Sequence, residues 1–210
     1  MKLYYVPNSR ANRPRWLLEE MGVPHELVRL DPRAGDNRKP EYLALNPLGH
    51  VPTLVDGDVT LYESAAILLY LAEMTDKFAP ETDDERNEVL RWILFDNHKF
   101  TSYFATYRFL YSLAPQAPDP AVLAFLKGRF DAAAAIVDKH LAGSKFMVGG
   151  KPTIADFSLA GYMFYPSDEH GYDWAKTHPG IHAWTERIRA LPGWKDPYGL
   201  MPGERFKPVR

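Results

Sequence analysis

The chain of 210 residues is 46% hydrophobic and 25% charged, which is typical of a folded globular protein with one or two domains. Its 25 Lys and Arg residues nearly balance its 27 Asp and Glu residues, so the formal net charge of −2 provides no global field for binding nucleic acid or an anionic membrane. The sequence contains no cysteine, which excludes disulfides, thiolate metal sites and a cysteine nucleophile in the protein itself.

Residues 1–75 alternate short apolar runs with helical patterns. The predicted elements are, in order, a strand over residues 3–6, a helix around 16–21 that Gly22 ends, a strand over 25–30, a hairpin over 53–61 and a helix from about Glu63 to Met74. The hairpin is predicted because an Asp-Gly pair at residues 56–57 separates two β-branched runs and suits a tight turn. This order is typical of a thioredoxin-like α/β domain.

The pattern changes after Thr75. Residues 76–85 are polar and acidic, as expected for a linker, and from Arg86 onward the strand signals stop. Helical periodicity continues through residues 89–108, 121–141 and 181–191. Thr153 and Asp156 have the spacing of a capping box at the start of a further helix. The sequence therefore predicts an α/β domain over 1–75, a linker over 76–85 and an all-α domain over 86–210.

Polar residues gather at three places in the first domain where chemistry could occur. Ser9 follows the first strand and precedes the first helix, where a hydroxyl can donate to an anion, although helix capping alone explains a serine there. A cis bond before Pro52 would turn the backbone of Val51 outward for pairing with a peptide, but most bonds before proline are trans. Glu63 and Ser64 suit a zwitterionic amino-acid end, and capping is again the alternative.

Weaker candidates lie in the second domain. Several aromatic residues recur there at helical spacing, which usually indicates core packing, yet many carry hydroxyls that need partners when buried. The consecutive residues 168–170 predict a solvated loop, since three adjacent side chains do not face one point. His178 and His182 are separated by Pro179 and Gly180, which argues against a helical metal site.

Taken in this order and spacing, the motifs resemble the cytosolic glutathione S-transferase family over essentially the whole chain. The segments that carry the resemblance are Leu-Tyr-Tyr-Val-Pro-Asn-Ser at 3–9, Asn-Pro-Leu-Gly-His-Val-Pro-Thr-Leu at 46–54, Tyr-Glu-Ser-Ala-Ala-Ile at 62–67 and Phe-Met-Val-Gly-Gly-Lys-Pro-Thr-Ile-Ala-Asp at 146–156. The resemblance implies a thioredoxin-like N-terminal domain that binds glutathione as co-substrate and an all-α C-terminal domain that binds a hydrophobic electrophile. It also implies a cytoplasmic homodimer in detoxification, without a metal, a nucleic acid or a membrane as partner.

The first motif is similar to that of the serine-type subfamilies, such as the theta and delta classes, and of bacterial relatives. By this resemblance the hydroxyl of Ser9 donates a hydrogen bond to the glutathione sulfur. Tyr5 lies about where tyrosine-type classes keep their catalytic phenol, and Arg10 is a further alternative. Cysteine-type bacterial enzymes are excluded because the chain has no cysteine.

The resemblance assigns the remaining parts of glutathione to the second and third motifs. Val51 and a cis Pro52 would bind the cysteinyl backbone, Glu63 and Ser64 the γ-glutamyl end, and His50 would lie near the glycyl carboxylate. The electrophile is expected against the aromatic residues Tyr103, Phe104, Tyr107 and Tyr111, with Tyr162 and Met163 as further candidates on the next helix.

The expected activity is glutathione transfer to hydrophobic electrophiles. The same thiolate could instead reduce disulfides or peroxides, or the chain could be a non-catalytic member of the family that only binds. Many relatives carry a basic residue after the Glu-Ser pair, where this chain has Ala65, and this departure keeps the binding alternative open. A plain interaction module whose aromatic stripe docks a partner helix is the alternative outside the family.

Overall fold

The computed structural model describes residues 1–203 and 208–209, and these form two compact units. The first unit contains residues 1–79 together with 192–203, and the second contains residues 80–191 together with 208–209. The predicted all-α domain over 86–210 differs from this division at its end. Residues 192–203 pack with the first unit, because Gly193 N donates to Glu20 Oε2 at 2.9 Å and Lys195 pairs with Glu19 at 2.8 Å.

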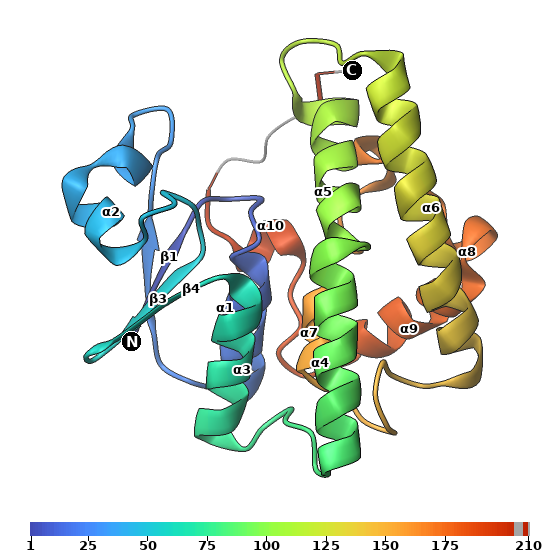
Figure 1. The fold of residues 1–210 in the computed structure, drawn as a ribbon, viewed down its shortest axis with the longest axis horizontal. Helices are drawn as coiled ribbons and strands as arrows, with labels where there is room; N and C mark the ends of the chain where they lie inside the picture. The colour runs from blue at the N-terminus through green and yellow to red at the C-terminus, as the bar shows by residue number, and fades with distance from the viewer. Residues whose placement is uncertain (204–207, 210) are drawn as a thin grey trace. The chain divides into compact units, whose positions relative to one another are not determined.

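The first unit is built on a four-stranded mixed sheet with strand order β2-β1-β3-β4 (Figure 1). Its strands are β1 (Lys2–Tyr5), β2 (Glu26–Arg29), β3 (Thr53–Asp56) and β4 (Val59–Tyr62). β1 runs parallel to β2 and antiparallel to β3. The predicted hairpin joins β3 to β4, and its turn contains Gly57 in the left-handed region with φ 58°.

Helices cover both faces of this sheet (Figure 1). They are α1 (Asn12–Met21) and α3 (Ser64–Thr75) on one face, α2 (Pro40–Leu45) on the other, and the short α10 (Pro197–Leu200), which packs against α1. The alternation of β1 explains the two faces. Leu3 and Tyr5 are buried on one side, and Tyr4 on the other contacts Tyr42 of α2 with ring centroids 5.5 Å apart. Gly22 ends α1 in the left-handed region, as predicted.

The second unit is helical. Its elements are α4 (Asp83–His98), α5 (Thr101–Arg108), a π-helical turn (Phe109–Leu113), α6 (Pro120–Gly143), α7 (Ile154–Ala160), a 3₁₀ turn (Ser167–Glu169), α8 (Trp174–Thr177) and α9 (Pro179–Arg189). α6 packs between α5 and α9, and α4 packs against α7. The continuous periodicity over residues 89–108 divides into two helices, because the Asp96 carboxylate accepts from Thr101 N at 3.2 Å and starts a new one. Among the described residues, no helix is both long and apolar enough to cross a membrane.

The predicted capping box at the start of α7 is confirmed. Thr153 N donates to Asp156 Oδ2 at 2.8 Å, and Trp184 of α9 donates through Nε1 to Asp156 Oδ1, also at 2.8 Å. Asp156 is 1% exposed, so its carboxylate ties the helix start to the centre of the unit.

The prediction of a solvated loop at residues 168–170 is wrong for two of its three residues. Glu169 and His170 are 0% and 1% exposed, whereas Asp168 is exposed. The reason is a buried partner for each side chain. Arg108 pairs with Glu169, and His170 bonds through Nε2 to the Tyr165 carbonyl oxygen at 3.0 Å and through Nδ1 to Tyr172 N at 3.0 Å.

Candidate functional site

The register of the sheet brings the three polar motifs of the first unit to one edge. Tyr4 of β1 pairs with Thr53 of β3, and Thr53 pairs with Tyr62 of β4. The end of β1, the start of β3 and the end of β4 are therefore neighbours, and the motifs that adjoin them lie side by side. Two strand spacings make this edge about 10 Å wide. An extended peptide of three residues is also about 10 Å long.

Ser9 lies in the loop between β1 and α1 and is half-buried. Its hydroxyl donates to the Val6 carbonyl oxygen at 2.6 Å and accepts from Ala11 N at 3.3 Å. α1 begins at Asn12, and its N-cap residue, Ala11, has no side-chain cap. The bond from Ala11 N to Ser9 is nevertheless the kind that a capping serine makes, so the capping alternative stays open for Ser9. Rotation of the hydroxyl would turn its single hydrogen toward an anion, while the oxygen still accepts from Ala11 N.

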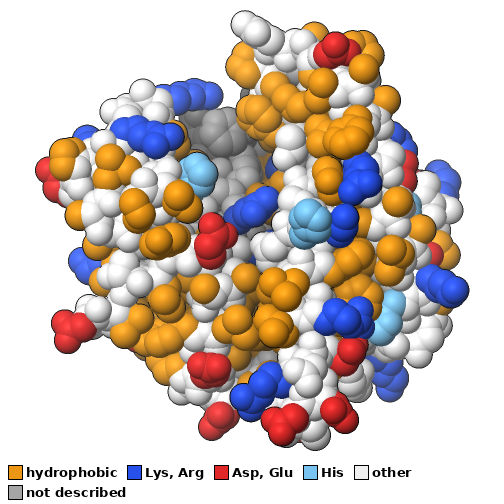
Figure 2. Space-filling model, viewed as in Figure 1, with side chains coloured by type: hydrophobic (Ala, Val, Ile, Leu, Met, Phe, Trp, Pro, Cys, Tyr) orange, Lys and Arg blue, Asp and Glu red, His pale blue; other side chains and the backbone are white. Residues whose placement is uncertain are grey.

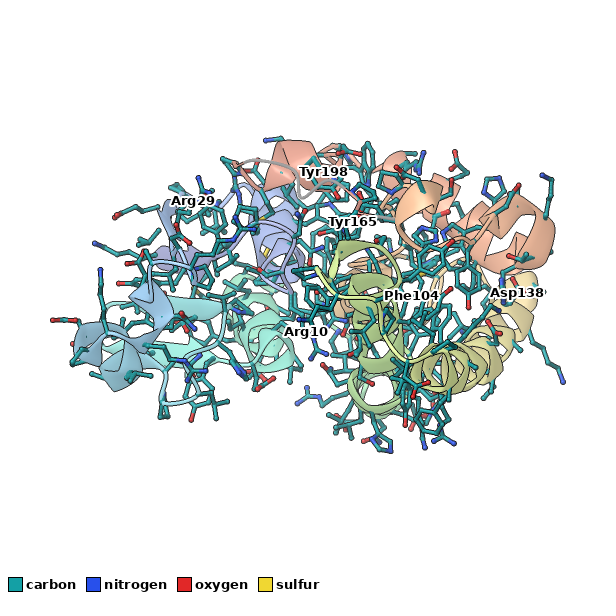
Figure 3. The ribbon with its side chains drawn as sticks, turned by 90° about the horizontal axis from the view of Figure 1, so that it is seen from above. Arg10, Arg29, Phe104, Asp138, Tyr165 and Tyr198 are labelled. Atoms are coloured by element: carbon teal, nitrogen blue, oxygen red, sulfur yellow. The ribbon has the colours of Figure 1, made fainter. Side chains whose placement is uncertain are left out.

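The two alternatives to Ser9 occupy different environments. Tyr5 is 4% exposed, and its phenol donates to the Pro202 carbonyl oxygen at 3.0 Å, which engages its only hydrogen within the first unit. Arg10 is half-buried at the start of the α1 segment and is labelled in Figure 3. The Tyr5 phenol therefore holds the returning segment 192–203, whereas the hydroxyl of Ser9 lies in the loop at the sheet edge.

The peptide bond between Val51 and Pro52 is cis, as the resemblance implied and as the sequence alone did not favour. A buried polar network holds the turn that leads to it. Asn46 donates through Nδ2 to the His50 carbonyl oxygen at 2.9 Å and to Thr53 Oγ1 at 3.1 Å. Tyr42 of α2 contacts the same two oxygens, at 2.5 and 2.8 Å. The network fixes the backbone on both sides of Val51, which is half-buried.

A second contact supports this turn from the other side. Gly49 has φ 63°, and a Cβ atom there would lie 2.7 Å from the Asn37 carbonyl oxygen, so only glycine fits. Asn37 Nδ2 donates to the Gly49 carbonyl oxygen at 2.8 Å. Nη1 of Arg38 would be 3.0 Å from the same Cβ, so this cation lies next to Gly49, the residue before the exposed His50. Sequence reasoning did not single out Arg38.

Glu63 occupies a strained backbone conformation. Its φ of 69° and ψ of 115° are rare for a residue with a side chain and cost about 1–3 kcal/mol. Glu63 makes no side-chain cap bond to α3, so the capping alternative does not account for it. The side chain is exposed, next to Ser64, the first residue of α3. The Glu63 carboxylate is therefore exposed beside the start of α3, where an ammonium group could reach it.

Ser64 is 2% exposed, and its hydroxyl accepts from Nη1 of Arg13 at 3.3 Å. Arg13 lies on α1 and is 0% exposed, so a buried guanidinium links α1 to the first residue of α3. Sequence reasoning also missed Arg13. The signal was available, because Arg13 precedes Trp16 and Leu17 by three and four residues and therefore falls on the apolar stripe of α1.

The aromatic residues predicted for the electrophile all lie on α5 and the turn after it, but they differ in exposure. Phe104 is 0% exposed and stacks on Phe130 at 4.4 Å, and Figure 3 shows it among the side chains of the helical unit. Phe104 is therefore a core residue that cannot contact an electrophile at the surface, as the packing alternative predicted. Tyr107 is 5% and Tyr111 is 37% exposed, and Tyr103 is half-buried. The further candidates Tyr162 and Met163 are buried.

Both units of the chain are similar to domains of known proteins. Residues 1–73 match the model of the glutathione S-transferase N-terminal domain, and residues 120–187 match that of the C-terminal domain. Glutathione S-transferase 3 of Zea mays is 31% identical over 96% of this chain and 95% of its own length. The chain belongs to the glutathione S-transferase family. Glutathione S-transferase F10 of Arabidopsis thaliana, at 29% identity over 93% of this chain and 95% of that protein, agrees with this membership.

Solved structures of glutathione S-transferases confirm the predicted fold class. The enzyme from Xanthobacter autotrophicus is 35% identical and superposes with a TM-score of 0.84 over 92% of this chain and 95% of that one. A family member from Pseudomonas fluorescens, 25% identical with a TM-score of 0.82 over 91% and 89% of the two chains, has two glutathione molecules bound. The fold is thus a thioredoxin-like domain followed by a helical domain. The serine-type subclass stays a prediction.

Proposed function

We propose that the protein is a glutathione transferase, which lowers the pKa of the glutathione thiol and directs the thiolate at hydrophobic electrophiles. The proposal rests above all on the convergence of Ser9, the cis Val51–Pro52 peptide and the Glu63–Ser64 pair at one sheet edge of tripeptide width. Membership of the family supports it, as does glutathione bound in a related structure. As in the family generally, we expect a cytoplasmic homodimer.

The first step is ionisation of the thiol. A free thiol has a pKa of about 8.5, so only a few per cent is thiolate at neutral pH. A hydrogen bond from Ser9 to the sulfur contributes about 1.5–3 kcal/mol, from which the bond to the Val6 carbonyl oxygen must be subtracted. The N-terminus of α1, a helix of 10 residues, adds about 0.3–1 kcal/mol. Ser9 thus acts as a donor to an anion and not as a nucleophile or base.

The rest of the tripeptide is held by groups that match its charges. The backbone of Val51 pairs with the cysteinyl residue in the manner of an added strand. The Glu63 carboxylate binds the γ-glutamyl ammonium, and Ser64 together with the α3 N-terminus binds the adjacent carboxylate. We expect His50, with Arg38 as a further cation, to meet the glycyl carboxylate at the other end.

The thiolate sulfur then attacks the electrophilic carbon, and the leaving group departs with the bonding electron pair. Of the predicted residues, Tyr103 and Tyr111 remain candidates for contact with the electrophile, because their rings are partly exposed, whereas Tyr107 is 5% exposed. Burial, with smaller contributions from Tyr111 and Asp131, raises the pKa of Tyr107 to about 12, so its phenol is neutral at physiological pH.

Two measurements test this function. The full chain should be retained on immobilised glutathione and should conjugate glutathione to an aromatic halide. Retention with turnover of a hydroperoxide but not of the halide would instead indicate a glutathione-dependent reductase. Retention without either activity would indicate a binding protein, and loss of both retention and activity would refute any role with glutathione.

A further inference from the structure

Asn8 lies between Pro7 and Ser9 in the loop after β1 and combines two unfavourable features. Its φ of 63° is in the left-handed region, where any residue with a side chain is strained. Its side-chain Nδ2 is buried and has no hydrogen-bond partner among the residues that the structure describes. A buried donor without a partner lowers the stability of a fold. Two such features at one half-buried residue require an explanation.

The stability of the loop does not explain an asparagine at this position. Glycine adopts a φ of 63° without strain and has no amide that needs a partner. The loop is also fixed on both sides without the side chain of Asn8. The Tyr5 phenol donates to the Pro202 carbonyl oxygen at 3.0 Å, and the Ser9 carbonyl oxygen accepts from Asn12 N at 3.2 Å. Because strain and unpaired polar groups concentrate at functional sites, the amide of Asn8 indicates contact with a ligand.

The amide of Asn8 is better prepared to donate to a ligand than the neighbouring hydroxyl. The hydroxyl of Ser9 must give up its bond to the Val6 carbonyl oxygen, 2.6 Å long, before it can donate elsewhere. Nδ2 of Asn8 makes no such bond, so its rotation toward a ligand breaks none. The whole contribution of a hydrogen bond to an anion is therefore available from Asn8.

A glutathione thiolate at this loop depends on local donors of this kind. The formal net charge is −2, and Figure 2 shows side chains of both signs on the face that it draws, so the surface provides no general attraction for an anion. Charges more than about 8 Å away are in any case largely screened by salt. The Ser9 hydroxyl and the α1 N-terminus together account for a thiol pKa of about 7, at which half of the thiol is still protonated at neutral pH. A second donor would complete the ionisation.

We propose that Asn8 is a catalytic residue whose side-chain amide donates to the thiolate sulfur of glutathione beside the hydroxyl of Ser9. The amide stabilises the charge and takes up no proton, since the proton of the thiol passes to water. The proposal rests on the proposed function, because it adds a donor to the same site. It involves the first unit alone.

Ultraviolet titration of the thiolate bound to the full chain tests this role. Asn8→Gly removes the amide and suits the left-handed backbone, so the midpoint of urea unfolding should be unchanged or higher. The pKa of bound glutathione should rise by about one unit or more. Asn8→Asp keeps the size of the side chain and replaces the donor by a carboxylate, so the pKa should rise further. The affinity of Asn8→Gly for S-methylglutathione, which has no thiol to ionise, should stay unchanged.

Asp76→Gly is the matched control. Asp76 also has a positive φ, 53°, but it follows the last residue of α3, at the opposite end of that helix from Ser64. This variant should leave the pKa of bound glutathione unchanged, and a rise equal to that in Asn8→Gly would trace the effect to the backbone and overturn the inference.

Two further results would overturn this inference alone. One is a wild-type protein in which the pKa of bound glutathione is lowered but Asn8→Gly does not raise it. The other is an Asn8→Gly protein that loses affinity for S-methylglutathione as strongly as for glutathione, which would make Asn8 a structural residue. A wild-type protein that binds no glutathione, or binds it with the pKa of a free thiol, refutes the proposed function instead.

Discussion

Replacement of Ser9 by alanine should raise the pKa of enzyme-bound glutathione by about one unit. The magnitude follows from the contact that the hydroxyl makes with the Val6 carbonyl oxygen at 2.6 Å, which must break before the hydroxyl can donate to sulfur. A neutral hydrogen bond contributes about 0.5–1.5 kcal/mol and one to an anion about 1.5–3 kcal/mol. Their difference, about 1.5 kcal/mol, corresponds to about one pKa unit.

The assay is the pH dependence of kcat/KM with chlorodinitrobenzene, together with ultraviolet titration of the bound thiolate. Well below both pKa values, the thiolate fraction of the Ser9→Ala protein is about tenfold lower, so kcat/KM falls by about threefold to tenfold, depending on how much more nucleophilic the less acidic thiolate is. On the alkaline plateau the two proteins should differ by about threefold or less, because the less acidic thiolate is the better nucleophile. If Ser9 only positioned the sulfur, Ser9→Ala would instead lower kcat/KM on the alkaline plateau and leave the pKa of the bound thiol unchanged.

Tyr5→Phe is the matched control for this substitution. It removes the phenol that donates to the Pro202 carbonyl oxygen, so it should lower the stability of the first unit and leave the thiol pKa unchanged. An unchanged thiol pKa in Ser9→Ala would refute the reasoning. A shift in Tyr5→Phe would then identify Tyr5 as the donor, and no shift in either variant would direct attention to Arg10.

Three further predictions concern the positions around the site. Gly49→Ala should lower the free energy of unfolding, measured in urea, by about 2 kcal/mol or more, since its Cβ would lie 2.7 Å from a backbone oxygen. Gly57→Ala is the control, because Gly57 has φ 58° with open space around it, and it should lower the free energy by only about 1 kcal/mol. Equal losses in the two variants would contradict the clash at Gly49. Glu63→Gln should weaken glutathione binding by up to about fivefold without affecting an analogue that lacks the α-amino group, and equal weakening of both ligands would exclude the ammonium contact. Burial lowers the pKa of His170 to about 4. Between pH 6.5 and 4 the unfolded chain therefore binds a proton that the folded chain does not. The contribution of His170 to the free energy of unfolding is fully present above pH 6.5 and falls by about 3 kcal/mol as the pH decreases toward 4. His170→Gln should show a smaller decrease in urea unfolding experiments over the same range, and parallel decreases would contradict a neutral buried imidazole.

The elements that depend on local patterns could be predicted from the sequence. The hairpin at Gly57 and the capping box at Thr153 follow from turn and cap chemistry within a few residues, and both are present. The motifs around Ser9 and Glu63 indicated a binding site only when their order and spacing were considered together, because helix capping explains each motif when it is taken alone. The structure weakens that explanation for Glu63, which makes no side-chain cap bond, whereas Ser9 accepts from Ala11 N just before α1.

Two of the residues that sequence reasoning missed, Arg13 and Arg108, are buried charges whose partners are distant in the chain. Arg13 meets Ser64 across 51 positions, and Arg108 meets Glu169 across 61. A charged residue in a single sequence is assigned to the surface by default, because burial of an unpaired charge is costly. Only the fold shows which charges are paired, and this explains the error at residues 168–170.

The return of residues 192–203 to the first unit has a consequence for how the protein is made. Leu200 and Met201 are buried, and the Pro202 carbonyl oxygen is the acceptor for Tyr5 in the first strand. The ribosome synthesises these residues after residues 80–191, which form nearly all of the helical unit. The N-terminal half of the chain, although translated first, therefore completes its core last, and a fragment cut at the end of α3 would leave that core open.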